Sequence, residues 1–475
     1  MKTKLEIKKK IIPPLDSDFT PAILWNKKFK ELVKESSNSR PIIISLTRSN
    51  GSVSTLKTEI FNENSQTDEL NLFYVERLIK FLLWMKGGYK ITIAGAPDIA
   101  AKIAKIYSKS GKRAFDWNIM GNKIYGSEMQ IISTSLDDRP EEKEFDIALG
   151  GNTNGCRVGF DLGGSDRKCA ALIDGKVIFT EEVKWDPYFQ KDPTWHKEGI
   201  NDSIKRAAKY LPRVDAIGGS AAGVYVNNQV RVASLFRGIS EENFQKHIVN
   251  LFNELQKEWN VPLVVVNDGE VSALAGAMSM KDNSVLGVSM GTSFAAGYVN
   301  PSGRITDWLN ELAFAPIDYR ENAPIDEWSG DKGCGVQFFS QQAVSRLIPS
   351  AGIKLHAEMP MPEKLIEIQN LMNKNDARAK KIYQTIGICF GYAIATYSEF
   401  YNIKNLLFLG RVSSGIGGEI IIDEAQNVLK IEFPEIAEKL KIKTPDEQMK
   451  RHGQAAAAAT LPIIPTKNSK NSINE

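Results

Sequence analysis

Apolar and polar residues alternate along the first 150 residues with the periods typical of strands and helices. Short apolar runs bounded by glycine, asparagine or serine predict buried strands, and a longer run with apolar residues at helical spacing predicts a helix that stops at Gly87. Strands that alternate with helices in this way predict an α/β layer architecture. The expected elements are a strand at 41–46, a turn at 49–52, a strand ending near Phe61, a helix over 70–85, a strand at 90–95 and a helix over 98–107.

The remainder of the chain repeats one pattern, an apolar strand that ends at glycine, serine, asparagine or aspartate. A charged run at 137–144 and a glycine-rich stretch at 150–155 predict a linker before this part. An alanine run at 455–459 predicts a packed helix. The expected domains are an N-terminal α/β domain over 1–150, a second domain over 156–300, a third over 301–460 and a polar, disordered tail over 461–475.

The composition is that of an ordinary globular protein, since 42% of the 475 residues are apolar and 25% are charged. A formal net charge of +3 gives no general attraction to nucleic acid or to an anionic membrane, so neither is an expected partner. No apolar run approaches the roughly 20 residues of a membrane helix, and the N-terminus lacks a secretory-signal pattern. Four dispersed cysteines favour reduced, buried thiols. We expect a cytoplasmic protein.

The strongest chemical signal lies where a strand ends at Asp161 and a glycine pair turns the chain into a second strand. Gly163 and Gly164 let backbone N–H groups approach phosphate oxygens, and Ser165 adds a hydroxyl donor. An aspartate at the strand end is placed to hold hydrated Mg²⁺, whose ligands are oxygens. Lys168 could contact a phosphate or pair with a carboxylate. The alternative is a plain β-hairpin with a glycine turn.

Two further strands end in polar or small residues. The segment from Ser220 to Gly223 follows an apolar strand, and its small side chains allow close approach by a ligand or equally by a neighbouring strand. A continuous apolar strand later ends in Asn267 and Asp268. An aspartate there suits a general base acting on a hydroxyl, although asparagine and aspartate are also ordinary helix caps.

Two other glycine turns complete the pattern. Gly291 and Thr292 lie between two strands and form, in principle, a second phosphate-binding hairpin. The segment around Gly410 and Ser413 joins a strand to a helix and suits the flat face of a nucleoside. Each signal is weak alone, whereas the order and spacing of all five segments are specific.

In this order the segments, over about 158–418, resemble the ROK family of sugar kinases and sugar-responsive repressors. Asp161-Leu-Gly-Gly-Ser-Asp-Arg-Lys168 resembles the family's first phosphate motif, D-x-G-G-T-x-x-K. The other matches are Ser220-Ala-Ala-Gly223 to S-x-P-G, Asn267-Asp268 to the E-N-D-A-N block, Met290-Gly-Thr-Ser-Phe-Ala-Ala-Gly297 to the second phosphate motif, and Gly410-Arg-Val-Ser-Ser-Gly415 to the adenosine-side turn. The resemblance implies two ribonuclease-H-like, actin-like ATPase lobes that close over ATP and sugar, formed by the second and third expected domains.

Departures from the family pattern fall in the sugar and zinc segments. The G-E-I-G-H segment appears as Asn310-Glu-Leu-Ala-Phe314, so Glu311 can still bind sugar while Phe314 replaces a histidine. Only Cys334 remains of the family's cysteine cluster, and one thiol cannot build a four-ligand site, so we expect no structural zinc. The next sugar-binding glutamate falls on Val336.

The resemblance implies an ATP-dependent sugar kinase, with ATP and Mg²⁺ as cofactors and a hexose or related carbohydrate as substrate. Asp268 would be the general base and Asp161 would hold Mg²⁺. Substrate would be bound by Asn267, Glu311, Ser220 and Gly223, and ATP phosphates and adenosine by Gly163, Gly164, Ser165, Lys168, Gly291, Thr292, Gly410 and Ser413. A homo-oligomer stays open. The alternatives are a sugar or nucleotide sensor with little catalysis and a chaperone-like ATPase.

The role of residues 1–150 is not predicted, because no winged helix of the family's repressors is recognisable there. The strand at 41–46 and the turn after it loosely resemble the strand and turn at Asp161. If the segment is a degenerate copy of the same fold, Ser45 stands where Asp161 does and cannot replace it as a metal ligand.

Overall fold

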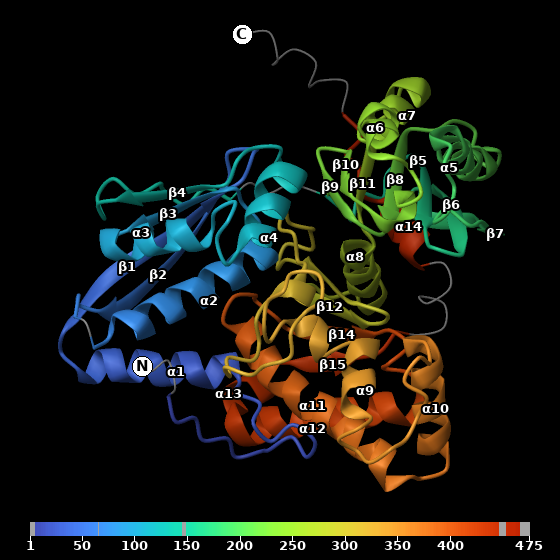
Figure 1. Cartoon of the computed structure of the whole chain (residues 1–475). Coiled ribbons are helices and arrows are strands. Elements are labelled where there is room, and N and C mark those ends of the chain that lie inside the picture. Colours follow the sequence, from blue (N-terminus) through green and yellow to red (C-terminus); the bar gives the residue numbers. More distant parts are fainter. Residues whose placement is uncertain (1–4, 65, 145–148, 446–452, 466–475) are drawn as a thin grey trace. The chain divides into compact units, whose positions relative to one another are not determined.

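A computed structural model describes residues 5–64, 66–144, 149–445 and 453–465 (Figure 1). The chain divides into two compact units, which we call unit 1 and unit 2. Unit 1 comprises Met1–Phe145, Val288–Ala296 and Asp307–Lys443, and unit 2 comprises Asp146–Gly287, Gly297–Thr306 and Thr444–Glu475. The N-terminal segment therefore shares a unit with most of the chain after 307, whereas the sequence placed boundaries at 150 and 300. The three-domain division itself stays a prediction.

The N-terminal part of unit 1 confirms the expected alternation of strands and helices. The helix over 70–85 is α2, and it ends at Gly87, whose φ of 79° is a conformation that glycine adopts without strain. The elements are α1 (Ala22–Glu35), β1 (Ser39–Thr47), β2 (Val53–Phe61), α2 (Asp68–Lys86), β3 (Lys90–Ala94), α3 (Pro97–Ile106), α4 (Ala114–Asp116), the π-helix η1 (Trp117–Tyr125) and β4 (Gln130–Thr134).

The N-terminal sheet has the strand order β2-β1-β3-β4. Strand β1 runs antiparallel to both β2 and β3, and β3 runs parallel to β4. In unit 2 the strand that follows the first hairpins, as β3 follows the β1–β2 hairpin, is β8 (Ala216–Ala221). It runs parallel to β5 (Cys156–Leu162), whereas β3 runs antiparallel to β1. The two sheets therefore differ in strand direction next to the hairpin, and the idea of a degenerate repeat finds no support in the topology.

The rest of unit 1 is mainly helical around a second sheet of order β13-β12-β14-β15. Strands β12 (Val285–Met290) and β13 (Phe294–Val299) enter this unit through residues 288–296. The other elements are η4 (Leu312–Phe314), η5 (Gly335–Gln337), α9 (Gln341–Leu347), α10 (Met361–Asn373), α11 (Ala377–Ser398), β14 (Asn405–Leu409), α12 (Gly415–Glu432), α13 (Pro434–Ala437) and β15 (Lys441–Lys443).

Unit 2 is built on a five-stranded sheet of order β11-β8-β5-β6-β7. Strands β5, β8 and β11 are mutually parallel, and β6 and β7 join as antiparallel hairpins. The elements are β5, β6 (Asp166–Ile173), β7 (Lys176–Lys184), α5 (Pro193–Ala208), β8, β9 (Val224–Val226), β10 (Gln229–Val232), η2 (Ser234–Phe236), α6 (Glu241–Asn243), η3 (Phe244–Ile248), α7 (Leu251–Trp259), β11 (Leu263–Asn267), α8 (Asp268–Met280) and α14 (Gln454–Ala459).

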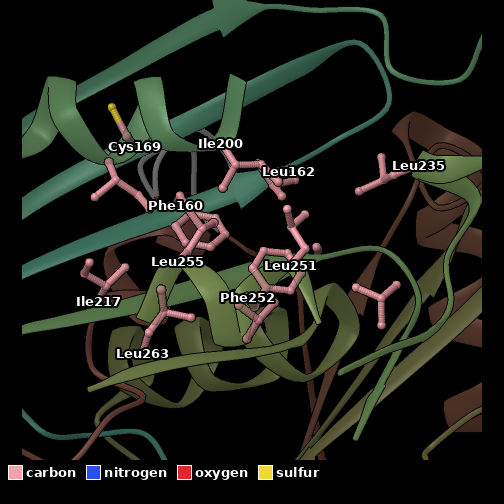
Figure 2. Packing of buried hydrophobic residues seen from close by; sticks show 14 of the residues in the cluster. Phe160, Leu162, Cys169, Ile200, Ile217, Leu235, Leu251, Phe252, Leu255 and Leu263 are labelled. Atoms are coloured by element: carbon pink, nitrogen blue, oxygen red, sulfur yellow. The ribbon is translucent and has the colours of Figure 1, made fainter. Parts of the chain in front are cut away.

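The two faces of the unit 2 sheet are covered by different elements. On one face, Phe160, Ile217 and Leu263 from three strands pack with Ile200 of α5 and Leu255 of α7 in one apolar core (Figure 2). Because alternate residues of a strand point to opposite faces, the neighbouring positions point the other way.

Helix α14, the predicted alanine-rich helix, covers the opposite face. A Cβ at Gly159 would lie 1.8 Å from the Ala455 carbonyl, and one at Gly218 would lie 1.7 Å from the Ala458 carbonyl. Only glycine permits this approach, so the small residues of β5 and β8 serve helix packing at these positions. Leu461 is fully buried, and the Pro462 carbonyl accepts a hydrogen bond from Arg157, so the packed chain extends beyond the predicted start of the tail.

Two expectations from composition can be compared with the described residues. All four cysteines are unpaired and buried, as expected. No helix in the described ranges combines the length and apolar character needed to cross a bilayer. Residues 466–475 of the predicted tail lie outside the described residues.

Candidate active site

Asp161 lies near the end of β5, on the sheet face that α14 covers. Its neighbour in β8 is Ser220, whose hydroxyl donates a 2.6 Å hydrogen bond to Asp161 Oδ1. Ser220 is fully buried and Asp161 is 5% exposed. The sequence assigned Ser220 to substrate binding, which remains untested, but the contact that it makes is with the carboxylate of Asp161.

Asp268 lies at the same edge of the sheet, two strands away. Parallel strands β5, β8 and β11 bring their carboxyl ends together, and Asp268 directly follows β11 as the first residue of α8. Two strand spacings put the β5 and β11 backbones about 10 Å apart. The two predicted acids, 107 residues apart in the chain (268 − 161), therefore share one sheet edge.

Both carboxyl groups have pKa values above the ordinary aspartate value. Burial raises the pKa of Asp161 to about 6, although the Ser220 hydrogen bond and the Lys168 charge lower it, and the charge of Asp268 adds to the rise. Burial also raises the pKa of Asp268, against hydrogen bonds from its own N–H and that of Gly269. Acids with raised pKa values at one sheet edge are typical of catalytic sites.

Asn267 has two structural contacts in the described fold. Its Oδ1 accepts a 2.7 Å hydrogen bond from the Gly269 N–H, so it is the cap of α8 that the alternative interpretation allowed. Its Nδ2 donates a 2.7 Å bond to the Gly223 carbonyl and so holds the segment after β8. Gly223 has φ 133°, and a Cβ there would lie 2.4 Å from the Val232 carbonyl.

The hairpin between β5 and β6 is held by its own polar groups. The Gly163 N–H donates to the Asp166 carbonyl at 2.9 Å, and Ser165 Oγ donates to Asp166 Oδ2 at the same distance. Lys168 Nζ lies 2.8 Å from Asp166 Oδ1 and 3.9 Å from Asp161 Oδ2. Burial lowers the pKa of Lys168, but these two carboxylates more than compensate and leave it raised.

The chemistry of this edge fits a hydrated cation. Asp161, Asp166 and Asp268 bring three carboxylates to this edge, and Lys168 contacts two of them. Mg²⁺ commonly takes one or two carboxylates and completes its shell with water and phosphate oxygens. Among the described residues, no group of three or more His, Cys, Asp and Glu side chains is arranged to hold a metal alone.

The second phosphate segment and the adenosine-side segment are neighbours within unit 1. The Val412 N–H donates to the Met290 carbonyl at 3.0 Å, and a Cβ at Gly410 would lie 2.4 Å from that oxygen. Ser413 Oγ donates to the Gly410 carbonyl at 2.7 Å and closes the turn before α12. Gly291 and its exposed neighbour Thr292 therefore lie next to the turn at 410–413.

The segment that departs from the family pattern packs against the N-terminal part of unit 1. The Glu311 N–H donates to the Trp84 carbonyl at 2.9 Å, at the end of α2. Phe314 lies 4.3 Å from the Trp84 ring and 5.8 Å from the Phe115 ring, measured between centroids. Val336 is buried in η5.

Sequence reasoning missed three residues that surround the first hairpin. Trp185 Nε1 donates to the Gly163 carbonyl at 2.8 Å. The Tyr188 hydroxyl would lie 2.1 Å from a Cβ at Gly164, so the ring rests against that glycine. The Arg237 guanidinium stacks over the Tyr188 ring at 3.9 Å. The aromatic run at 185–189 was the available signal, but its proximity to the hairpin depends on the fold.

Comparisons with known proteins show which sequences and folds the chain resembles. Residues 157–415 match the ROK family. A ROK hexokinase from Thermus thermophilus superposes with a TM-score of 0.51 at 17% identity, over 64% of this chain and 97% of that one. A ROK family transcriptional regulator, a homologue of the E. coli MLC protein, gives 0.50 at 18% identity, over 65% and 78%. A ROK family glucokinase from Streptomyces griseus, in complex with glucose and AMPPNP, gives 0.47 at 18%, over 64% and 98%. No curated protein sequence matches the chain.

The first two similarities establish the fold and nothing further, because both identities lie below 25%. The chain has the mixed α/β, actin-like ATPase fold of these proteins over about 64% of its length, as the sequence predicted. Because the superposed proteins include both a kinase and a regulator, the fold alone leaves catalysis to be argued from the site.

Proposed function

Because the chain belongs to the ROK family, we propose that it is an ATP-dependent kinase that phosphorylates a hydroxyl group of a hexose or related carbohydrate. The observation that carries the proposal is the pair Asp161 and Asp268 on one sheet edge, both with raised pKa values. A regulator that only binds sugar needs no base at that edge, whereas phosphoryl transfer does use one.

In this proposal Asp268 accepts the proton of the sugar hydroxyl as the oxygen attacks the γ-phosphoryl group of ATP. A carboxylate with a raised pKa is a better proton acceptor than an ordinary aspartate. Asn267, Gly223 and Glu311 orient the sugar, and Ser220 supports this edge through Asp161.

The phosphates are held by backbone N–H groups and by one lysine. Gly163, Gly164 and Ser165 form the first hairpin, with Lys168 at the start of the returning strand. Gly291 and Thr292 form the second hairpin, and Gly410 and Ser413 flank adenosine. Asp161 would hold Mg²⁺, which when bound neutralises charge on the phosphate oxygens. Positioning and electrostatics supply most of the rate in phosphoryl transfer.

A sugar or nucleotide sensor is the second candidate, and one observation favours it. Phe314 replaces a polar residue of the family's sugar segment and packs on Trp84 and Phe115. The segment expected to bind sugar therefore departs further from the family pattern than the phosphate segments do. A sensor would keep sugar binding and lose turnover.

An ADP-release assay over hexoses, N-acetylhexosamines and polyols separates the two candidates. The kinase proposal predicts ADP formation that depends on one class of sugar and on Mg²⁺. Sugar binding in a calorimeter without ADP formation would favour the sensor. Absence of both sugar binding and turnover over the whole panel would contradict both candidates.

A further inference from the structure

Two loops of unit 2 that carry no recognised motif are fixed together beside the first hairpin. One loop, residues 186–190, lies between β7 and α5, and the other, residues 234–238, contains η2 and Arg237. His196 is fully buried, and its Nε2 lies 3.1 Å from the Pro187 carbonyl and 3.2 Å from the Leu235 carbonyl. Since carbonyl oxygens only accept, the imidazole donates to both loops and joins them.

Gly238 brings the same two backbones into contact. A Cβ at Gly238 would lie 2.5 Å from the Gln190 carbonyl and 3.0 Å from the Tyr188 carbonyl. No larger residue fits without moving one loop. The relative position of the two loops is therefore set by packing before any ligand arrives.

This arrangement places Arg237 over two aromatic rings. Its guanidinium lies 3.9 Å from the Tyr188 centroid and 5.2 Å from the Phe189 centroid. Planar guanidinium groups stack well on aromatic faces and keep their N–H groups free at the edge of the stack. The Tyr188 hydroxyl in turn rests against Gly164 of the first hairpin.

Arg237 has no carboxylate partner among the described residues, and its exposed side chain is stacked on the Tyr188 ring. By contrast, Arg213 on the same unit pairs with Asp215 at 2.8 Å, and Arg206 pairs with Asp202 at 2.7 Å. A positioned guanidinium with open N–H groups beside a phosphate-type hairpin is suited to bidentate contact with an oxyanion.

We infer that Arg237, held by Tyr188, is an oxyanion-binding residue of the active site. The inference rests on the proposed function for the location of ATP and sugar. The oxyanion is either the transferred phosphoryl group of ATP or an acidic substituent of the sugar, such as a carboxylate. In the second case the substrate is an anionic sugar, and Arg237 determines that specificity.

Calorimetric titration of the full chain distinguishes these sources. The probes are Mg²⁺–AMPPNP, glucose, glucuronate and glucose 6-phosphate, each with wild type, Arg237→Gln and the control Arg213→Gln. Loss of one charged hydrogen-bonded contact should weaken binding about tenfold or more. A loss for AMPPNP assigns the contact to the nucleotide phosphate, and a loss confined to the two acidic sugars assigns it to the sugar. Arg213→Gln should match the wild type.

Two further variants test the stack itself. Tyr188→Leu removes the ring beneath the guanidinium and should weaken the same probe as Arg237→Gln, whereas Tyr188→Phe keeps the ring and should bind close to wild type. Affinities of Arg237→Gln within twofold of wild type for every probe, or no binding of any anionic probe by the wild type, would overturn the inference. Both results are binding affinities, which do not depend on turnover. Absence of ADP formation would therefore reject the kinase proposal without affecting this inference.

Discussion

Two groups of buried charges in this protein are organised in opposite ways. In unit 1, three cations and three carboxylates pair with one another between the N-terminal segment and the loop before η5. Arg113 Nη1 lies 2.5 Å from Asp331 Oδ1, and Lys80 Nζ lies 2.5 Å from Asp116 Oδ1. The six residues, each at most 5% exposed, are Glu76, Arg77, Lys80, Arg113, Asp116 and Asp331.

Among the residues that the structure describes, the charges at the sheet edge of unit 2 do not balance. Asp161 and Asp268 both carry raised pKa values, and Lys168 makes its shorter contact with Asp166. A matched group satisfies its own charges and fixes structure, whereas unmatched buried carboxylates cost stability and are retained where chemistry requires them. The charge balance thus separates a structural cluster from a candidate active site.

The largest change in stability should come from removing one carboxylate of the buried six-residue cluster in unit 1. Asp331→Asn leaves three buried cations with two carboxylates, because Asp331 contacts Arg77, Lys80 and Arg113. Removing one partner of a buried ionic group costs about 3–5 kcal/mol in free energy of unfolding. Urea denaturation measures the change. The exposed Asp137→Asn is the control and should stay within about 0.5 kcal/mol of wild type. Equal stability of the two variants would refute the structural role of the cluster.

The corresponding change in unit 2 should act in the opposite direction. Asp161 has a folded-state pKa of about 6 against an ordinary value of 3.8, so the folded chain binds more protons than the unfolded chain between these values. The free energy of unfolding therefore falls as the pH rises from 4 to 6 and stays lower above 6. Asp161→Asn removes this cost and should stabilise the protein at pH 7 by on the order of 1–3 kcal/mol.

The pH dependence provides the control for Asp161→Asn. The stabilisation should shrink as the pH falls from 7 towards 4, because wild-type Asp161 then becomes protonated in the folded state and no longer carries a buried charge. The same variant should lose activity that depends on Mg²⁺. Urea midpoints at several pH values measure the effect, and a variant less stable than wild type at pH 7 would show that Asp161 is not an unfavourable buried charge.

A smaller effect should follow from removing the Ser220 hydroxyl, which donates to Asp161. Ser220→Ala removes a 2.6 Å hydrogen bond to the carboxylate, so the ionised form is less favoured. The pKa of Asp161 should rise further, by roughly one unit. Carboxyl NMR titration can follow it. Ser165→Ala is the matched control, since Ser165 donates to Asp166 instead. An unchanged pKa in Ser220→Ala would mean that the hydroxyl does not set the ionisation of Asp161.

Much of the fold could be predicted because local signals and tertiary structure agree. The apolar strands at 41–46 and before Asn267 became β1 and β11. The acids Asp161 and Asp268 could be recognised because each lies at the end of an apolar strand, whereas the membership of both strands in one sheet became visible only with the fold.

The missed contacts are those between segments far apart in the sequence. Glu76, Arg77 and Lys80 interrupt the apolar helix α2, and this interruption was the one sequence signal of a buried ionic cluster. Their partner Asp331 lies some 250 residues later, which no local pattern reveals. For the same reason the stack of Arg237 on Tyr188 beside Gly164 became visible only with the fold.

The rate of phosphoryl transfer by Asp268→Asn is the measurement that bears most directly on the pair of carboxylates. With a sugar that the wild type phosphorylates, kcat should fall about 10²–10⁴-fold while calorimetric affinities for sugar and AMPPNP stay within a few-fold. Asp174→Asn is the control, because asparagine readily adopts the φ of 47° found there. A kcat equal to that of the wild type, with Asp174→Asn also unchanged, would remove Asp268 as the general base.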